Sequence, residues 1–261
     1  MPTFTGPDGV RLCYEIVGEG PPLLLHLGSG CDSTLWQRAG YLEPLSKSYR
    51  CIVFDHRGHG RSDKPRGPEA NHVNRYVADV VALQDHVGID RSAFWGYSAG
   101  IAVGLKLALD HPTRVTALVG SGGMGQATPE QIREIVTNRV AELRQYGWEK
   151  LLDRFDKQEP EPVPEWMKEQ IRATDTQQFI DWFLALPDWD WDDWASLPQI
   201  ATPTLFMVGE LEDPKDETAR AAGLMPNATR VRIPGQGHIN AFLKSAVVLP
   251  EVTAFLARQK S

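Results

Sequence analysis

The chain has 261 residues, of which 42% are hydrophobic and 23% are charged, and its formal net charge at pH 7 is −7. This composition is typical of a folded, water-soluble protein and excludes disordered, coiled-coil and fibrous classes. The acidic balance also makes nucleic acids and anionic membranes poor partners, because both carry negative charge.

The N-terminal stretch MPTFTGPDGVRL lacks the basic start and apolar core of a signal peptide, and no apolar run approaches the ~20 residues of a membrane span. We therefore expect a cytoplasmic monomer or homodimer whose partner is a small molecule. Cys13, Cys31 and Cys51 show no C-x-x-C spacing, which favours reduced thiols over a disulfide framework or a zinc site. Cys31 is expected either to pack in the core or to line a pocket.

Short apolar runs alternate with amphipathic stretches over the first 120 residues. The expected strands are 11–18, 22–27, 50–54, 92–97 and 114–120, and the expected helices between them are 74–89 and 99–111. Continuous apolar strands separated by helices indicate a mostly parallel sheet that is buried on both faces.

The pattern changes over residues 124–196, where no strand-like run occurs and the expected helices are polar with apolar stripes. The strand pattern resumes at 202–210, followed by an expected helix at 214–225, a strand at 229–235 and a closing helix. The sequence therefore predicts a core formed by 1–123 and 197–261, interrupted by a helical insertion over 124–196.

The segment GYSAG matches the pattern G-x-S-x-G and lies between an expected strand and an expected helix. Gly96 and Gly100 would let the backbone turn sharply and expose the hydroxyl of Ser98. The helix N-terminus would also favour the negative charge that develops when a serine attacks a carbonyl. Ser98 is the predicted nucleophile.

A serine hydroxyl needs a base, and the base needs an orienting group. His238 lies in the loop GQGH between the last strand and the last helices. It follows the nucleophile in chain order, as the base does in proteins whose G-x-S-x-G serine lies between a strand and a helix. The remaining histidines are expected to have packing, capping or surface roles: His26, His56, His59, His72, His86 and His111.

The orienting acid is expected in GELEDP, just past the strand at 202–210. We prefer Asp213, because two or three loop residues bring it to the sheet edge and Pro214 is well placed to open the next helix. Glu212 is the alternative.

Together, DHRGHGRSD at 55–63, GYSAG, GELEDP and GQGH resemble the α/β-hydrolase fold superfamily, in the branch of small esterases, lactonases and C–C hydrolases. The resemblance implies an eight-stranded, mostly parallel sheet flanked by helices, with a helical lid inserted after strand 6. It also implies that the D-x-R-G-x-G-x-S segment is a structural loop. Dehalogenases and epoxide hydrolases use a carboxylate nucleophile, whereas position 98 is serine.

The resemblance places the oxyanion-binding N–H groups on Ala99 and, in the segment LGSGCD, on Ser29. The family's usual histidine is replaced by Leu27, so Gly28 or Gly30 stays open as a shifted assignment. We expect the substrate to contact Gly28, Trp36, Tyr97 and Trp182. Because a serine, a histidine and an acid are present, we expect no metal and no organic cofactor.

Six of the eight tryptophans lie in 124–196, which also holds 16 acidic against 8 basic residues. These rings would either cover an apolar substrate or attach the insertion to the core. An acidic lid would suit the free amine of a prolyl-aminopeptidase substrate, although a solvated acidic face is the simpler interpretation.

We therefore expect a serine hydrolase that cleaves a small carboxylic ester or lactone through an acyl-enzyme. Two alternatives stay open: the same triad acting on a C–C bond or a peptide, and a ligand sensor that turns over slowly.

Overall fold

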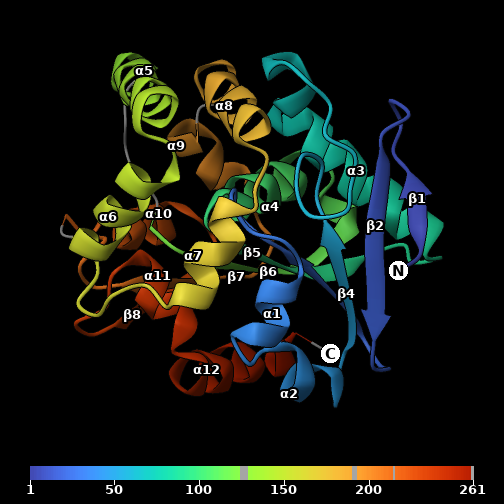
Figure 1. The fold of residues 1–261 in the computed structure, drawn as a ribbon. Coiled ribbons are helices and arrows are strands. Elements are labelled where there is room, and N and C mark those ends of the chain that lie inside the picture. Colours follow the sequence, from blue (N-terminus) through green and yellow to red (C-terminus); the bar gives the residue numbers. More distant parts are fainter. Residues whose placement is uncertain (124–128, 190–192, 214, 260–261) are drawn as a thin grey trace.

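The computed structural model describes residues 1–123, 129–189, 193–213 and 215–259 (Figure 1). These residues form an eight-stranded sheet in the order β1-β2-β4-β3-β5-β6-β7-β8. Strand β2 runs antiparallel to β1 and β4, and the other pairs are parallel. The strands are β1 Thr3–Thr5, β2 Arg11–Val17, β3 Pro22–His26, β4 Arg50–Asp55, β5 Ser92–Tyr97, β6 Val115–Ser121, β7 Thr204–Gly209 and β8 Ala228–Ile233. The mostly parallel eight-stranded sheet is thus confirmed.

Helices cover both faces of this sheet, because successive strand residues point to opposite sides. Leu23 and Leu25 of β3 pack with α1, α2, α11 and α12, whereas Leu24 packs with α3, α4 and α10 on the other face. The bounds of these helices are α1 Thr34–Arg38, α2 Leu42–Ser46, α3 Val73–His86, α4 Ala99–Asp110, α10 Glu217–Leu224, α11 His238–Leu243 and α12 Ser245–Arg258. No described helix is long and apolar enough to cross a bilayer.

The chain forms further helices after β6 and before β7, and they lie to one side of the sheet in Figure 1. They are α5 Pro129–Tyr146, α6 Trp148–Gln158, α7 Glu165–Arg172, α8 Thr176–Ala185 and α9 Asp193–Ser196. Val136 and Val140 of α5 pack against Leu151 and Ile180 in a small apolar cluster, while Met167 of α7 joins the main core. The segment therefore has its own interior and is also tied to the sheet.

The tryptophans of this segment contact protein groups. The Trp148 indole donates to Thr176 Oγ1 at 3.1 Å, and the Trp189 indole donates to the Asn71 carbonyl at 3.1 Å. Trp182 is 8% exposed and packs edge-on against Trp189. Of the two interpretations left open, these contacts favour attachment of the helices to each other and to the core. Trp191 lies outside the described residues.

The 55–62 loop after β4 is held by a buried ion pair. The Arg57 guanidinium, which is fully buried, donates to both Asp79 carboxylate oxygens at 2.7 and 2.8 Å and to Asp8 at 2.8 Å. Burial opposes the charge of Arg57, but these carboxylates outweigh it and raise the arginine pKa. The loop is thereby anchored to α3, in keeping with a structural role.

Replacing Arg57 with Met should lower the free energy of unfolding by about 3–5 kcal/mol, because Asp79 would stay buried without its partner. Urea unfolding followed by circular dichroism measures this loss. Arg61→Met is the matched control: its side chain is half exposed, and buried Asp55 keeps the backbone N–H groups of Ser33 and residue 61 as donors, so we expect at most about 1 kcal/mol. Equal losses in the two variants would contradict the role assigned to Arg57.

Candidate active site

Ser98 occupies a strained turn between β5 and α4. Its backbone has φ 56° and ψ −123°, a conformation that costs a non-glycine residue about 1–3 kcal/mol. A Cβ on Gly96 would lie 2.2 Å from the Gly100 carbonyl oxygen, and one on Gly100 would lie 2.8 Å from the His26 carbonyl oxygen. Both glycines are thus required by close backbone approach, and the turn leaves Ser98 partly exposed.

His238 begins α11 and its imidazole is bound by a carboxylate. Its Nδ1 lies 2.6 Å from Glu212 Oε2. Glu212 in turn accepts hydrogen bonds from the N–H groups of Gly209 at 2.9 Å and Gly123 at 3.0 Å. The carboxylate is therefore fixed between the ends of β6 and β7, and it fixes the imidazole.

The preferred acid, Asp213, lies elsewhere, and the expectation for it needs correction. Its carboxylate accepts from the N–H groups of Glu217 at 2.7 Å and Thr218 at 3.2 Å, and it lies 3.5 Å from Arg230. It therefore caps the start of α10. The bond from Gly209 N–H folds Glu212 back over the sheet edge, so the next residue points toward the helix instead.

Glu212 and His238 each stabilise the charged form of the other. Burial raises the pKa of the Glu212 carboxyl, but the charge and hydrogen bond of His238 outweigh this and lower it overall. Burial lowers the pKa of His238, but the Glu212 carboxylate and, less strongly, Glu159 raise it overall. When Nδ1–H of the neutral imidazole donates to Glu212, the lone pair of Nε2 is free to accept a proton.

Ser98 and His238 lie in the same neighbourhood. The ring of Tyr97, next to Ser98, stacks on the imidazole with centroids 5.1 Å apart. The Ser98 N–H donates to the Ser121 carbonyl at 2.8 Å, and a Cβ on the following Gly122 would lie 2.9 Å from His238 Cε1. The strand ends thus bring the predicted nucleophile and base together, with Glu212 behind the base.

The 28–30 loop, which follows β3, lies against Ser98. A Cβ on Gly28 would be 3.1 Å from Ser98 Oγ. Within the described residues the N–H groups of Ser29 and Ala99 have no hydrogen-bond acceptor, whereas Gly30 N–H donates to His59 Nε2 at 2.9 Å. The two predicted oxyanion donors are therefore available, and the shifted assignment to Gly30 does not fit.

Two expected substrate contacts need correction in this structure. Trp36 is completely buried, with ring contacts to Trp95 at 5.1 Å and Phe242 at 5.3 Å, so its ring belongs to the core. Tyr97 is 3% exposed and lies between His238 and Phe242. Both side chains were expected to face a ligand because they lie near motifs in sequence, but helix α1 packs Trp36 against the sheet and the last residue of β5, Tyr97, packs under α11.

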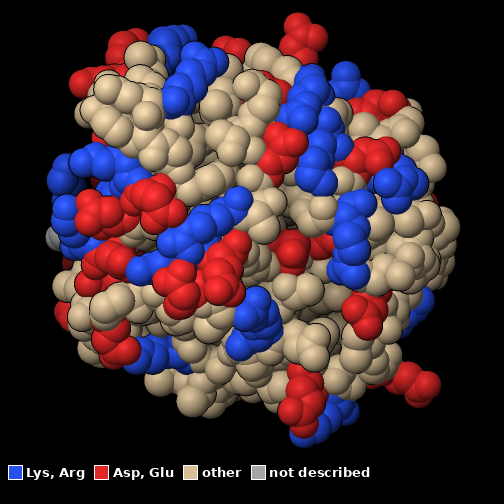
Figure 2. All heavy atoms as spheres, in the orientation of Figure 1, with Lys and Arg blue, Asp and Glu red and all other residues tan. Residues whose placement is uncertain are grey.

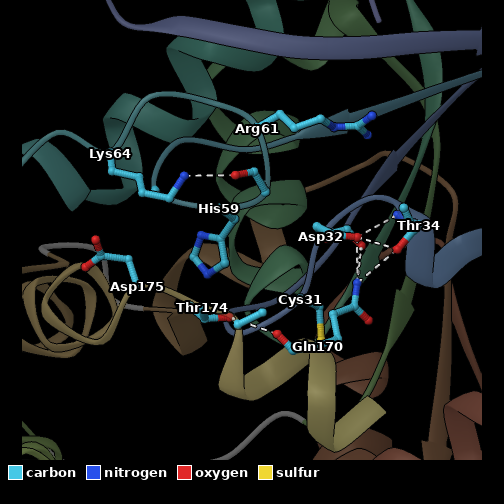
Figure 3. Close-up of a pocket in the computed structure, with 12 residues that line it drawn as sticks. Cys31, Asp32, Thr34, His59, Arg61, Lys64, Gln170, Thr174 and Asp175 are labelled. Carbon is cyan, nitrogen blue, oxygen red and sulfur yellow. Dashed lines mark hydrogen bonds between the residues drawn. The ribbon is translucent and has the colours of Figure 1, made fainter. Parts of the chain in front are cut away.

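A polar cavity of about 330 Å³ lies beside the 28–30 loop (Figure 3). Its walls come from three segments: the residues after that loop, the 55–62 loop with Lys64, and the end of α7. Cys31 lines it, and burial raises the pKa of this thiol to about 12, which makes it a poor nucleophile. Within the described residues no three His, Cys, Asp or Glu side chains are grouped to hold a metal ion.

Acidic and basic side chains are interspersed on the face that carries α6 and α7 (Figure 2). Arg172 contacts Glu149 at 2.8 Å and Glu165 at 2.6 Å, and Lys168 contacts Asp156 at 2.5 Å. Acidic residues of the 124–196 segment are thus engaged in ion pairs, which favours the solvated-face interpretation over an amine-binding lid.

The sequence and the fold of the chain match one class of protein. A profile of the alpha/beta hydrolase fold matches residues 21–245, so the chain belongs to the α/β-hydrolase family. Its fold matches that of a thermophilic esterase from Thermogutta terrifontis, with a TM-score of 0.87 and 23% identity over 100% of this chain and 99% of the other.

Two named bacterial proteins are similar to this chain in sequence. Over 127 residues the chain is 33% identical to a protein of Azorhizobium caulinodans named as the carbamate hydrolase RutD, covering 49% of this chain and 46% of that protein. The chain spans about half the length of the first such proteins that it matches. Over 222 residues it is 28% identical to 3-oxoadipate enol-lactonase 2 of Acinetobacter baylyi, covering 81% of this chain and 79% of the other.

Proposed function

We propose that this protein is a serine hydrolase that cleaves a small carboxylic ester or lactone through an acyl-enzyme. The observation that carries the proposal is the 2.6 Å contact between His238 Nδ1 and Glu212 beside a strained, partly exposed Ser98. A carboxylate, an imidazole and a serine in this order form the arrangement that activates a serine hydroxyl. Glu212 replaces Asp213 in the proposed triad.

The reaction would proceed in two acyl transfers. Ser98 Oγ attacks the carbonyl carbon while its proton passes to His238 Nε2, and the N–H groups of Ser29 and Ala99 bind the oxyanion. The imidazolium then protonates the leaving alcohol as the C–O bond breaks. A water molecule, deprotonated by His238, attacks the acyl-enzyme, and Ser98 regains its proton as the acid leaves.

The names of similar proteins support the proposed substrate class. Relatives are named as a lactonase and as carbamate hydrolases, all of which cleave a carbonyl compound by addition of water. Ser98, His238 and Glu212 are not among the residues that line the cavity beside the 28–30 loop, so that cavity does not define the substrate. Residues 124–196 are proposed to form the lid over the 1–123 and 197–261 core. Gly28 is the expected substrate contact that the proposal retains, whereas the ring of Trp182 is 8% exposed and packs against Trp189.

A panel of p-nitrophenyl esters, lactones and an aryl carbamate, together with fluorophosphonate labelling, tests this function. We expect turnover of at least one ester or lactone, and a mass increase of one phosphonyl group on the peptide that contains Ser98. Turnover of a diketone or a proline amide instead would favour the C–C hydrolase or peptidase alternative. Labelling with only slow turnover would favour a sensor, and neither labelling nor turnover would refute the proposal.

The pH profile of kcat/KM should fall on the acid side with a midpoint above the ordinary histidine value near 6.5. The base must be neutral, and the carboxylates of Glu212 and Glu159 stabilise its charged form, so activity is lost as pH falls through the raised pKa. Tyr97 stacks on the same imidazole.

Glu159→Gln should therefore move this midpoint to lower pH, because the amide carries no charge. Glu161→Gln is the matched control: Glu161 is exposed two residues further on and pairs with Lys244 at 3.1 Å, so we expect no movement. A midpoint that rises in Glu159→Gln would contradict the assigned electrostatics.

A further inference from the structure

Three histidines outside the proposed triad form a buried cluster behind the 28–30 loop. His26 ends β3, and His56 and His59 belong to the 55–62 loop. Each is at most 3% exposed. The rings of His26 and His56 are parallel with centroids 5.0 Å apart, and those of His56 and His59 are 3.9 Å apart. Imidazoles grouped in this way are polar groups that need hydrogen-bond partners.

Their ring nitrogens contact successive backbone groups of one short segment. His26 Nδ1 lies 2.7 Å from the Leu27 carbonyl oxygen, and His56 Nε2 lies 3.1 Å from the Gly28 carbonyl oxygen. His59 Nε2 accepts the Gly30 N–H at 2.9 Å. The histidines therefore hold the peptide groups on both sides of Ser29, and Ser29 itself is partly exposed.

We propose that His56 and His59 are positioning residues for the oxyanion hole, an inference that rests on the proposed function. The peptide between Gly28 and Ser29 is trans and planar, so its C=O and N–H point in opposite directions. Because His56 binds the C=O, the Ser29 N–H points away from the buried rings and is presented to the oxyanion. Because the Gly30 N–H donates to His59, it is not available to bind the oxyanion.

Further hydrogen bonds fix the loop that carries His56 and His59. Asp55 accepts the Ser33 N–H at 2.8 Å and the Arg61 N–H at 2.9 Å, which ties the segment after the 28–30 loop to the loop that carries both rings. His59 Nδ1 lies 3.2 Å from the carbonyl oxygen of Arg57, whose side chain is anchored to Asp79. The positions of the rings are thus set by buried contacts, although His59 also lines the cavity in Figure 3.

The contact from Gly30 requires a neutral His59 ring, whereas both nitrogens of His56 face carbonyl oxygens: Nε2 lies 3.1 Å from that of Gly28 and Nδ1 lies 3.1 Å from that of Arg57. His59 can accept at Nε2 only when its proton is on Nδ1, and His56 can donate to Gly28 only when its proton is on Nε2. Burial lowers the pKa of both histidines, and for His59 the neighbouring His56 lowers it further. Neutral imidazoles are therefore favoured.

Paired variants test the proposal at each ring. The amide of glutamine reaches about as far as Nε2, whereas that of asparagine reaches only as far as Nδ1. We expect His59→Asn and His56→Asn to lower kcat/KM about 10- to 100-fold through kcat, with KM little changed. The corresponding glutamine variants should stay within about threefold of the wild type. His111→Gln, at the far end of α4, is the control.

Inhibition by an aryl boronic acid, which forms a tetrahedral adduct with serine, gives a readout of the oxyanion hole itself. We expect its Ki to rise in the asparagine variants by the same factor as kcat/KM falls, and to be unchanged in the glutamine variants. Thermal unfolding of all variants separates this effect from a loss of folded protein. Equal activity and Ki in the asparagine and glutamine variants would overturn the proposal.

Imidazole ¹⁵N spectra of the wild type provide a measurement that needs no variant. We expect His59 to be protonated on Nδ1 and His56 on Nε2, with both rings neutral near pH 7. A proton on His59 Nε2 would overturn the inference even if the protein hydrolyses esters. If the wild type neither hydrolyses esters nor reacts with a fluorophosphonate, the proposed function fails, whatever tautomers are found.

Discussion

Replacing Ser98 with Ala is expected to lower kcat for the preferred ester or lactone by about 10⁶-fold, which leaves only the small residual rate that the oxyanion hole and binding supply. The hydroxyl is the nucleophile of the proposed reaction, and no other side chain can take its place on this turn. Initial rates measured at saturating substrate, with the variant purified in parallel, give the loss. Fluorophosphonate labelling of the same peptide should disappear.

Ser48→Ala is the control, because this exposed serine lies just before the amino end of β4, at the edge of the sheet opposite the carboxyl ends that carry the site. We expect its kcat to be unchanged. Residual turnover by Ser98→Ala above about a thousandth of the wild type would contradict a covalent mechanism through Ser98 and would indicate that water is activated directly.

Glu212→Gln should lower kcat by about 10⁴-fold, whereas Asp213→Asn should leave kcat within a few-fold of the wild type. Glutamine keeps the shape of Glu212 but cannot hold the imidazole in its Nδ1–H tautomer as a carboxylate does. Asp213 instead caps α10, so its replacement should cost about 1 kcal/mol of stability and lower the melting temperature.

The two variants serve as controls for each other, since one should lose activity and the other stability. Steady-state kinetics and thermal unfolding on the same preparations measure both. A larger loss of kcat in Asp213→Asn would reverse the assignment and restore the acid that the sequence favoured.

The sheet was largely predictable from the sequence. Runs such as 50–54 and 92–97 correspond to β4 and β5, because strands buried on both faces must be continuously apolar. Strand β1 was not predicted: it has three residues, and only Phe4 among them is buried. A strand this short has no periodicity, and its pairing with β2 decides its conformation.

The site was predictable where the backbone imposes a residue type. The turn at Ser98 has glycines on both sides because a Cβ at either position would collide with backbone atoms. The acid carried no such signature, since Glu212 and Asp213 are adjacent carboxylates in one loop. Their roles differ through the hydrogen bonds from Gly209 to one and from α10 to the other.

The sequence by itself determined the family, the strands from β2 onward and the glycine-flanked turn that carries the proposed nucleophile, because those depend on local patterns and on glycines that close contacts require. The choice of acid, the burial of Trp36, and the link between two buried histidines and the 28–30 loop were decided only by tertiary structure. Each depends on hydrogen bonds or packing between residues far apart in the chain, whose partners no local pattern specifies.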